Sequence, residues 1–91
     1  MDRPIFSWEL FDKMPIVGII RNLTVADINF VLPIYKQAGF TTIEITLNTP
    51  EALSVISSLA LEYKGELNVG AGTVCTLDDL AAAITAGANF I

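Results

Sequence analysis

Histidine is absent from this 91-residue sequence, and cysteine and basic residues are scarce. Without histidine, the chain lacks the commonest general base and the commonest metal ligand of proteins. Its single cysteine, Cys75, can form neither an internal disulfide nor a thiolate zinc cluster, and we expect a small apolar filler there. Five Lys and Arg residues stand against ten Asp and Glu, a net charge of −5, which argues against a nucleic-acid partner.

Long apolar runs are also missing, although 53% of the residues are hydrophobic and only 16% are charged. No run approaches the roughly 20 residues that span a bilayer, and the first residues lack the basic segment and apolar core of a secretory signal. We therefore expect a cytoplasmic protein without a membrane partner. The apolar composition suits a piece of a larger buried architecture, so part of the surface is expected to face a partner.

Strand-like and helix-like segments alternate along the whole chain. Strands are predicted over residues 15–20, 41–47, 67–71 and 88–91, and helices over residues 8–13, 25–38, 50–63 and 77–86. Hydroxyl residues precede the helices as N-caps and glycines follow three of them as stops: Ser7, Thr24, Thr49 and Thr76, and Gly39, Gly65 and Gly87. Pro33 is expected to kink or weaken the second helix.

This alternation predicts the α/β class, because strands joined by single helices must run parallel. The short, regular unit favours a (β/α)8 TIM barrel over a doubly wound sheet. Residues 1–91 would supply its first three to four βα units, as the amino-terminal part of a single barrel without an internal domain boundary.

The most informative residue is Glu44, in a segment with strict alternation. Thr42, Glu44 and Thr46 share one face of the predicted strand, and the intervening aliphatic residues take the other. In a parallel sheet covered on both faces, a carboxylate is costly unless a partner satisfies it. Glu44 is therefore predicted to have a catalytic role, or alternatively to be a structural partner of Arg21.

Reactive groups of β/α proteins gather at the carboxyl ends of the strands. Arg21, the segment 44–48 and the segment 70–73 should meet there, forming a pocket for a small anionic substrate. Alternatives remain for each: Arg21 could be a solvated loop residue, the glycines could serve close packing, and Thr73 could bond to backbone. G-A-G-T lacks the G-K-[ST] ending of a nucleotide-binding loop.

A Schiff-base lysine must be desolvated, so that its amine is neutral near pH 7. Lys13, Lys36 and Lys64 fall near helix ends or on predicted helix surfaces. None of them is a credible nucleophile.

Four segments together resemble the 2-keto-3-deoxy-6-phosphogluconate (KDPG) aldolases and the related 4-hydroxy-2-oxoglutarate and phosphogalactonate aldolases. They are P-I-V-G-I-I-R (15–21), A-G-F-T-T-I-E-I-T-L-N-T-P (38–50), V-G-A-G-T-V (69–74) and A-G-A-N-F-I (86–91). The resemblance implies a class I aldolase on a (β/α)8 barrel, usually a homotrimer, with neither metal nor organic cofactor. Such an enzyme cleaves a 2-keto-3-deoxy acid to pyruvate and an aldehyde through a lysine Schiff base.

By this resemblance Glu44 looks like the general acid/base, and Thr73 with Gly72 like part of the pyruvate-binding wall. Arg21 looks like a contact to the polar end of the substrate. Asn48 stands where many gluconate-specific members carry arginine, and asparagine is similar to what galactonate-type members show. The family's Schiff-base lysine lies on a later strand, so we expect this chain alone to be inactive.

Two other interpretations remain open. The first is a non-catalytic half-barrel that pairs with itself or with a complementary fragment, since an open parallel sheet leaves an unpaired edge. The second is another phosphate-binding barrel, such as a thiamine-phosphate synthase, whose diagnostic phosphate loops come later in the chain.

Overall fold

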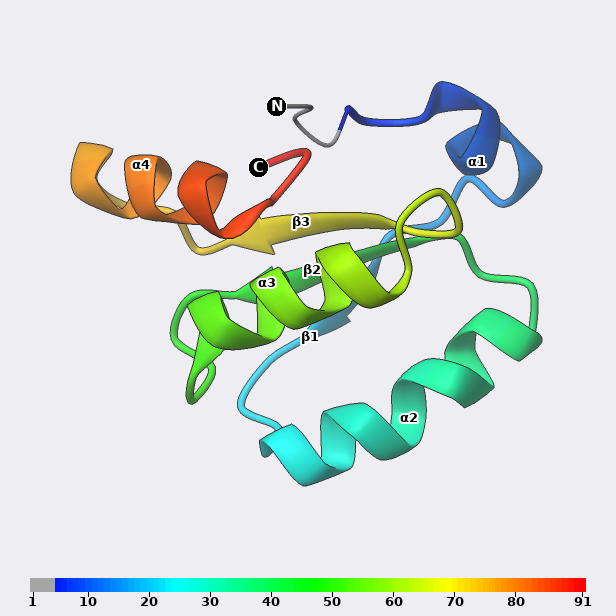
Figure 1. Ribbon diagram of the computed structural model, residues 1–91, viewed down its shortest axis with the longest axis horizontal. Helices are drawn as coiled ribbons and strands as arrows, with labels where there is room; N and C mark the ends of the chain where they lie inside the picture. The colour runs from blue at the N-terminus through cyan, green and yellow to red at the C-terminus, as the bar shows by residue number, and fades with distance from the viewer. Residues whose placement is uncertain (1–4) are drawn as a thin grey trace.

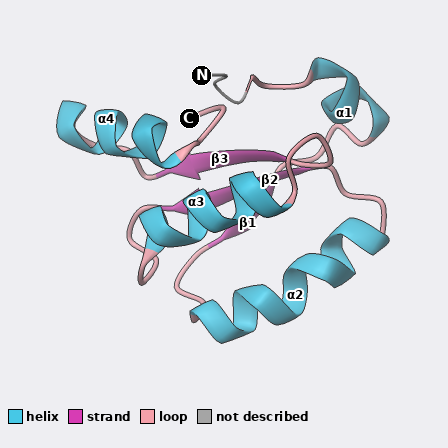
Figure 2. Ribbon diagram, in the orientation of Figure 1, coloured by secondary structure: helices cyan, strands magenta, loops and turns pink. Residues whose placement is uncertain are grey.

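The computed structural model describes residues 5–91, which fold as alternating helices and parallel strands (Figure 1). The order of the elements is α1 (Trp8–Lys13), β1 (Gly18–Ile20), α2 (Val25–Gln37), β2 (Thr42–Thr46), α3 (Ala52–Glu62), β3 (Asn68–Gly72) and α4 (Leu77–Ala86). The strands form one parallel sheet in the order β1-β2-β3 (Figure 2). The predicted α/β class is thus confirmed, with three strands of sheet in the described part of the chain.

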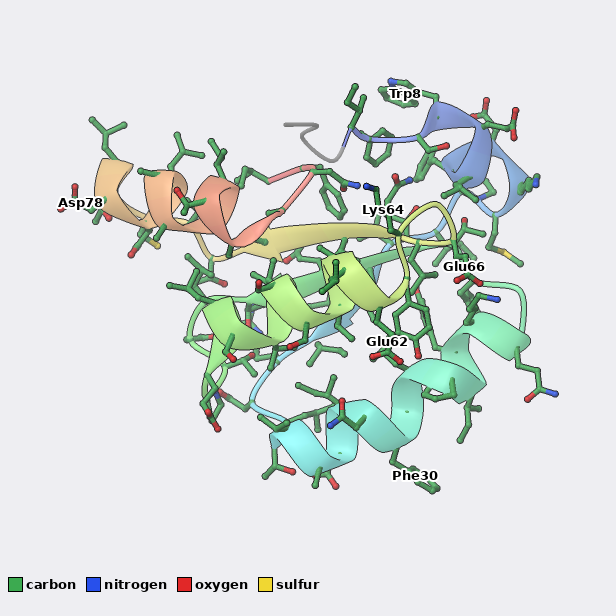
Figure 3. All side chains as sticks on the ribbon, in the orientation of Figure 1. Trp8, Phe30, Glu62, Lys64, Glu66 and Asp78 are labelled. Atoms are coloured by element: carbon green, nitrogen blue, oxygen red, sulfur yellow. The ribbon has the colours of Figure 1, made fainter. Side chains whose placement is uncertain are left out.

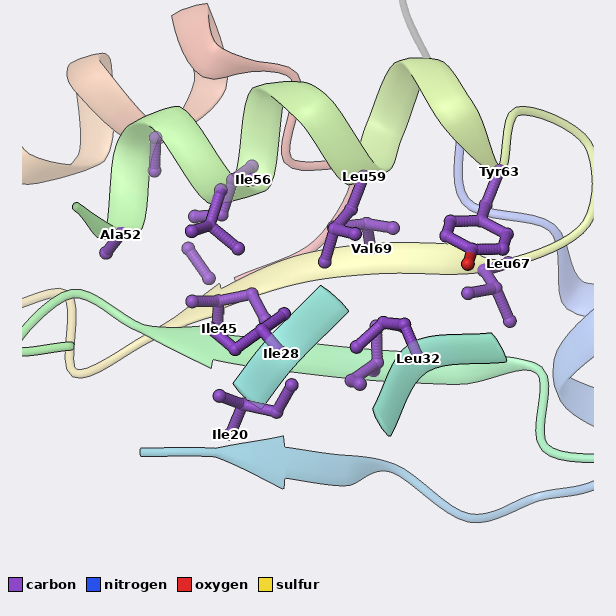
Figure 4. Packing of buried hydrophobic residues seen from close by; sticks show 14 residues of the cluster. Ile20, Ile28, Leu32, Ile45, Ala52, Ile56, Leu59, Tyr63, Leu67 and Val69 are labelled. Carbon is purple, nitrogen blue, oxygen red and sulfur yellow. The ribbon is translucent and has the colours of Figure 1, made fainter. Parts of the chain in front are cut away.

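The hydrophobic core lies between the sheet and the helices α2 and α3, which cover one of its faces (Figure 4). Ile43 and Ile45 of the central strand β2 point into this core and are at most 1% exposed. Ile28 and Leu32 of α2 cover them, as does Ile56 of α3. The alternation predicted for β2 is therefore confirmed, and Glu44 lies on the sheet face opposite the helices.

The N-terminal segment is fastened across the amino ends of the strands by buried polar groups. Asn68 is 1% exposed, and its Oδ1 accepts from the backbone N–H of Ser7 at 2.7 Å. Its Nδ2 donates to the carbonyl of Ser7 at 2.9 Å, and Thr41 Oγ1 donates to the carbonyl of Leu10 at 2.5 Å. In Figure 1, α1 accordingly lies at the end of the sheet opposite the loops that follow the strands.

Three of the four predicted helix caps are confirmed. The hydroxyl oxygens of Ser7, Thr24 and Thr76 accept from the backbone N–H three residues on, as N-caps do. The cap predicted at Thr49 is wrong: α3 begins after Glu51, which has left-handed backbone (φ 56°) and makes no side-chain cap bond. The hydroxyl of Thr49 is engaged in the site described below.

The strands differ from prediction at their ends. The strand predicted over 15–20 is limited to β1, because Ile16 N–H turns back to the Met14 carbonyl at 2.7 Å instead of joining the sheet. The strand predicted over 88–91 is not formed, although two backbone bonds already link this segment to β3: Asn89 N–H to Val69 O at 2.8 Å, and Ala71 N–H to Phe90 O at 3.1 Å.

Two predictions concerned single residues inside or beside helices. Pro33 lies inside α2, which runs as one helix from Val25 to Gln37. Cys75 was expected to fill the core, and this is wrong: it is exposed in the loop before α4, with Sγ 3.7 Å from the carbonyl oxygen of Thr73.

Candidate active site

Glu44 lies in the middle of the sheet, paired with Ile19 on one side and Gly70 on the other. Its side chain leans along the strand towards the carboxyl edge and fills the space over Gly72. A Cβ atom built on Gly72 would lie 2.9 Å from Glu44 Cγ and closer still to the carboxyl group. A partly buried acid is thereby turned towards the edge where β/α proteins bind their ligands.

Apolar groups lie beside Glu44 on both neighbouring strands. The ring of Phe90 covers Gly70, where a Cβ atom would lie 2.6 Å from the ring carbon Cδ1. On the other side lies Ile19, which is 61% exposed. Glu44 therefore has a phenyl ring, a glycine and an aliphatic side chain around it on this face of the sheet.

Arg21 does not pair with Glu44. Within residues 5–91, the one ion pair joins Lys36 Nζ and Glu66 Oε1 at 2.8 Å, and Arg21 is exposed. The alternative prediction, a structural Arg21–Glu44 pair, is thus not observed. Arg21 follows Ile20, which pairs with Ile45, so its backbone enters the loop at the level of Thr46.

A polar network joins the loops that follow β1 and β2. Thr46 Oγ1 donates to Asn48 Oδ1 at 2.6 Å, and it lies 2.9 Å from Thr49 Oγ1. Thr49 Oγ1 accepts from the backbone N–H of Asn22 at 3.1 Å and lies 3.4 Å from the carbonyl oxygen of Ile20. Asn48 and Arg21 are therefore carried by loops that share one set of hydrogen bonds.

Thr73 leaves the end of β3 with left-handed backbone (φ 55°), which is rare for a β-branched residue. Such strain persists only where the surrounding structure fixes it, and it is frequent at functional sites. Thr73 is exposed, and no hydrogen bond from its hydroxyl to backbone is found in the part of the chain that the structure covers. The alternative of a backbone-bonded hydroxyl is therefore not supported.

The lysines lie near helix ends, as predicted. Lys13 ends α1 and is exposed, and Lys64 follows α3 (Figure 3). Lys36 is held by Glu66, whose hydrogen bond and charge raise the pKa of the Lys36 ammonium above its ordinary value. An amine with a raised pKa is protonated at neutral pH and is a poor nucleophile.

Among residues 5–91, no group of three or more His, Cys, Asp or Glu side chains is arranged to hold a metal ion. No helix of the described chain has the length and apolar character needed to cross a bilayer.

Sequence reasoning missed the roles of Thr46 and Thr49. Thr49 looked like a helix cap because Pro50 and Glu51 follow it, a frequent pattern at helix starts. The available signal was spacing: two hydroxyl residues flank Asn48 at positions −2 and +1, immediately after a buried strand.

A parallel β/α sheet with one acid turned to its carboxyl edge places that acid where β/α proteins hold their ligands. The chain belongs to the KDPG and KHG aldolase family, whose model matches residues 9–91. It is 34% identical over 89 residues to a 2-dehydro-3-deoxy-phosphogluconate aldolase of Pseudoalteromonas atlantica, covering 94% of this chain and 40% of that protein. It is 29% identical over 79 residues to the 2-dehydro-3-deoxy-6-phosphogalactonate aldolase of Escherichia coli, covering 87% and 38%.

Solved structures agree with this assignment. The KDPG aldolase of Legionella pneumophila, with pyruvate captured at low pH as a covalent carbinolamine intermediate, superposes with a TM-score of 0.75 and 26% identity over 87% of this chain and 38% of that one. A 4-hydroxy-2-oxoglutarate/2-dehydro-3-deoxyphosphogluconate aldolase superposes with a TM-score of 0.71 and 26% identity over 88% and 38%. The chain thus spans about 40% of the length of the first curated relative that it matches.

Proposed function

We propose that this chain is part of a class I aldolase that cleaves a 2-keto-3-deoxy-6-phospho sugar acid or 4-hydroxy-2-oxoglutarate to pyruvate and an aldehyde. The observation that carries the proposal is the Glu44 carboxyl group, which lies over Gly72 at the carboxyl edge of a parallel sheet. Membership of the aldolase family and the carbinolamine of the Legionella relative support the reaction class.

Glu44 would act as the proton-transfer group. In a Schiff-base aldolase a lysine amine adds to the keto carbon, and the resulting carbinolamine loses water to form an iminium ion. Removal of the proton from the C4 hydroxyl then breaks the C3–C4 bond, and the electron pair moves towards the iminium. A single carboxyl group beside the reacting carbons can take and return these protons in turn.

We propose that none of Lys13, Lys36 and Lys64 is the nucleophile, because all three lie at helix ends or on the surface. We therefore propose that the complete protein supplies it from another strand, and that these 91 residues alone do not cleave the substrate. Arg21, Asn48, Gly72 and Thr73 would form the substrate-binding wall around Glu44.

Assembly and location follow from the same family resemblance. We propose a cytoplasmic homotrimer that uses neither metal nor organic cofactor, with residues 1–91 as the amino-terminal part of one (β/α)8 barrel. Phe30, which is 72% exposed and points away from the sheet on α2, supports a surface that an assembly covers (Figure 3).

Borohydride trapping in the presence of pyruvate tests the reaction class. The complete protein should gain the mass of a reduced pyruvate adduct, and the 91-residue chain should gain none. In the complete protein, Glu44→Gln should lower kcat by about 100-fold or more while the exposed-acid control Glu66→Gln leaves it unchanged. An adduct on the short chain, or full activity of Glu44→Gln, would contradict the proposal.

A second candidate is a half-barrel that associates without catalysis. The exposed Ile19 on the edge strand β1 favours it, since an apolar, unpaired edge invites pairing with another chain. Light scattering on the 91-residue chain distinguishes the two candidates: a stable dimer or larger assembly supports the half-barrel, and a monomer argues against it.

A further inference from the structure

The hydroxyl groups of Thr46 and Thr49 are buried at the carboxyl edge of the sheet, where the first is 0% and the second 3% exposed. Buried hydroxyls need partners, and these two find them in each other and in the two loops of the site. The network contains the N–H of Asn22, the two hydroxyls and the side chain of Asn48. The donor and the acceptor of each hydrogen bond in this network can therefore be assigned in turn.

The distances favour one direction for this hydrogen-bond chain. Thr49 Oγ1 accepts the N–H of Asn22, and its own proton can go to Thr46 Oγ1 at 2.9 Å or to the Ile20 carbonyl at 3.4 Å. The shorter contact is the stronger bond, so Thr49 donates to Thr46. Thr46 then has its single proton free for Asn48 Oδ1, at 2.6 Å.

This direction fixes the orientation of the Asn48 amide. Because Oδ1 is occupied by a hydroxyl donor, the Nδ2 group, which carries two N–H donors, must point the other way. Asn48 is exposed in the loop that follows β2, so those donors are open to solvent at the carboxyl edge of the sheet. Donors in this position suit oxygen atoms of a carboxylate or carbonyl group.

We propose that Thr46 and Thr49 are positioning residues that aim the amide nitrogen of Asn48 at the oxygens of the keto-acid substrate. This inference rests on the proposed aldolase function and adds the means by which one of its substrate contacts is oriented. Thr49 also holds the N–H of Asn22, whose backbone is left-handed (φ 59°), and thereby fixes the loop that begins at Arg21. The buried hydroxyls of Thr46 and Thr49 would thus position two candidate substrate contacts, Asn48 and Arg21.

Kinetics of the complete aldolase with Thr46→Val and Thr46→Ser test this role. Valine has the shape of threonine without the hydroxyl, and Thr49 keeps the Ile20 carbonyl as an acceptor, so the fold should survive. We expect KM to rise about 3- to 10-fold, the equivalent of one lost hydrogen bond, with kcat changed less than about twofold. Thr46→Ser, which retains the hydroxyl, should restore the original KM.

A double-mutant cycle with Asn48→Ala separates positioning from a general structural effect. If Thr46 acts through Asn48, adding Thr46→Val to Asn48→Ala should raise KM no further. Additive effects, or an unchanged KM in Thr46→Val, would overturn the inference. Asn48→Asp is a further test, at an exposed position. It keeps the oxygen that accepts from Thr46 but replaces the outward N–H donors by a carboxylate oxygen. Its KM should rise at least as much, and an unchanged KM would refute the inference as well.

Failure of the inference and failure of the proposed function give different results. A complete protein that forms no pyruvate adduct and cleaves no keto acid refutes the aldolase function and the inference with it. An active wild-type enzyme whose KM is indifferent to Thr46→Val refutes the positioning role alone.

Discussion

Replacement of Gly72 by alanine should disable the acid at position 44 with little damage to the fold. The added Cβ would lie 2.9 Å from Glu44 Cγ and closer still to the carboxyl group, so the two cannot share this space. Gly72 is not among the glycines with positive φ in the described chain, so the backbone there accepts alanine. What must move is the free end of a flexible side chain.

The expected magnitudes follow from that geometry. Overpacking costs about 1 to 3 kcal/mol, but the displaced carboxyl group can turn towards the open edge, which places the cost at the low end. Replacing glycine by alanine also lowers the conformational entropy of the unfolded chain, which stabilises the folded protein by about 0.4 to 1 kcal/mol. Misplacing a catalytic group by about 1 Å can lower the rate by about 100-fold, which corresponds to about 2.7 kcal/mol in the activation free energy.

The assay compares Gly72→Ala with Gly70→Ala in the complete aldolase. Both glycines lie on the same face of β3, but a Cβ at Gly70 would meet the ring of Phe90, at 2.6 Å from Cδ1, instead of Glu44. We measure kcat from the release of pyruvate and stability from urea unfolding. Gly72→Ala should lose activity while it stays folded, and Gly70→Ala should lose stability while its kcat is largely retained.

Two results would refute the reasoning. If Gly72→Ala keeps kcat within about threefold of wild type, a difference of about 0.7 kcal/mol, the position of the Glu44 carboxyl group does not govern the reaction. If Gly70→Ala loses as much activity as Gly72→Ala, the effect belongs to the strand in general and not to the contact with Glu44.

Two predictions concern the fold. Asn68→Ala leaves the backbone N–H of Ser7 without its partner, while the Ser7 carbonyl keeps its bond from the N–H of Phe11, so the free energy of unfolding should fall by about 1 to 3 kcal/mol. Asn29→Ala, on the exposed side of α2, is the control, and equal losses in the two variants would contradict this account. The Tyr35 hydroxyl donates to the Thr42 carbonyl, and burial raises its pKa above the ordinary 10.0. Its stabilisation is therefore complete below pH 10.0 and is lost as the pH rises through the folded-state pKa. Tyr35→Phe should be less stable than wild type at pH 8 and approach it above pH 10 in urea unfolding, whereas a difference independent of pH would refute this.

Local signals predicted those elements whose ends are decided within a few residues. The helix over 8–13 was predicted to the residue, because Ser7 caps it through a bond to a neighbouring turn. The helix over 77–86 was likewise correct, because Thr76 caps its start and Gly87 (φ 109°) ends it. Such contacts join residues close in sequence, so the residue types alone reveal them.

Contacts between distant segments decided what the sequence could not reveal. Thr49 failed as a helix cap because its hydroxyl accepts the N–H of Asn22 from another loop, a partner that no local pattern predicts. The strand before α2 is shorter than its apolar run because the N–H of Ile16 bonds back to the Met14 carbonyl, and the N–H of Gly18, the first strand residue, bonds to the Tyr35 hydroxyl at 3.0 Å. At Glu44, alternation predicted the correct face, but the lean over Gly72 depends on space in the neighbouring strand.

The two glycines of the segment V-G-A-G-T-V leave room for two different side chains. Gly70 leaves room for the ring of Phe90, and Gly72 leaves room for the carboxyl group of Glu44. The first contact docks the end of the described chain on the sheet; the second directs an acid to the carboxyl edge. Because each glycine accommodates a different side chain, a single motif combines a packing function with a site function, and substitutions two residues apart should separate them. Comparison of Gly70→Ala with Gly72→Ala therefore tests whether stability and catalysis depend on different glycines of the same strand.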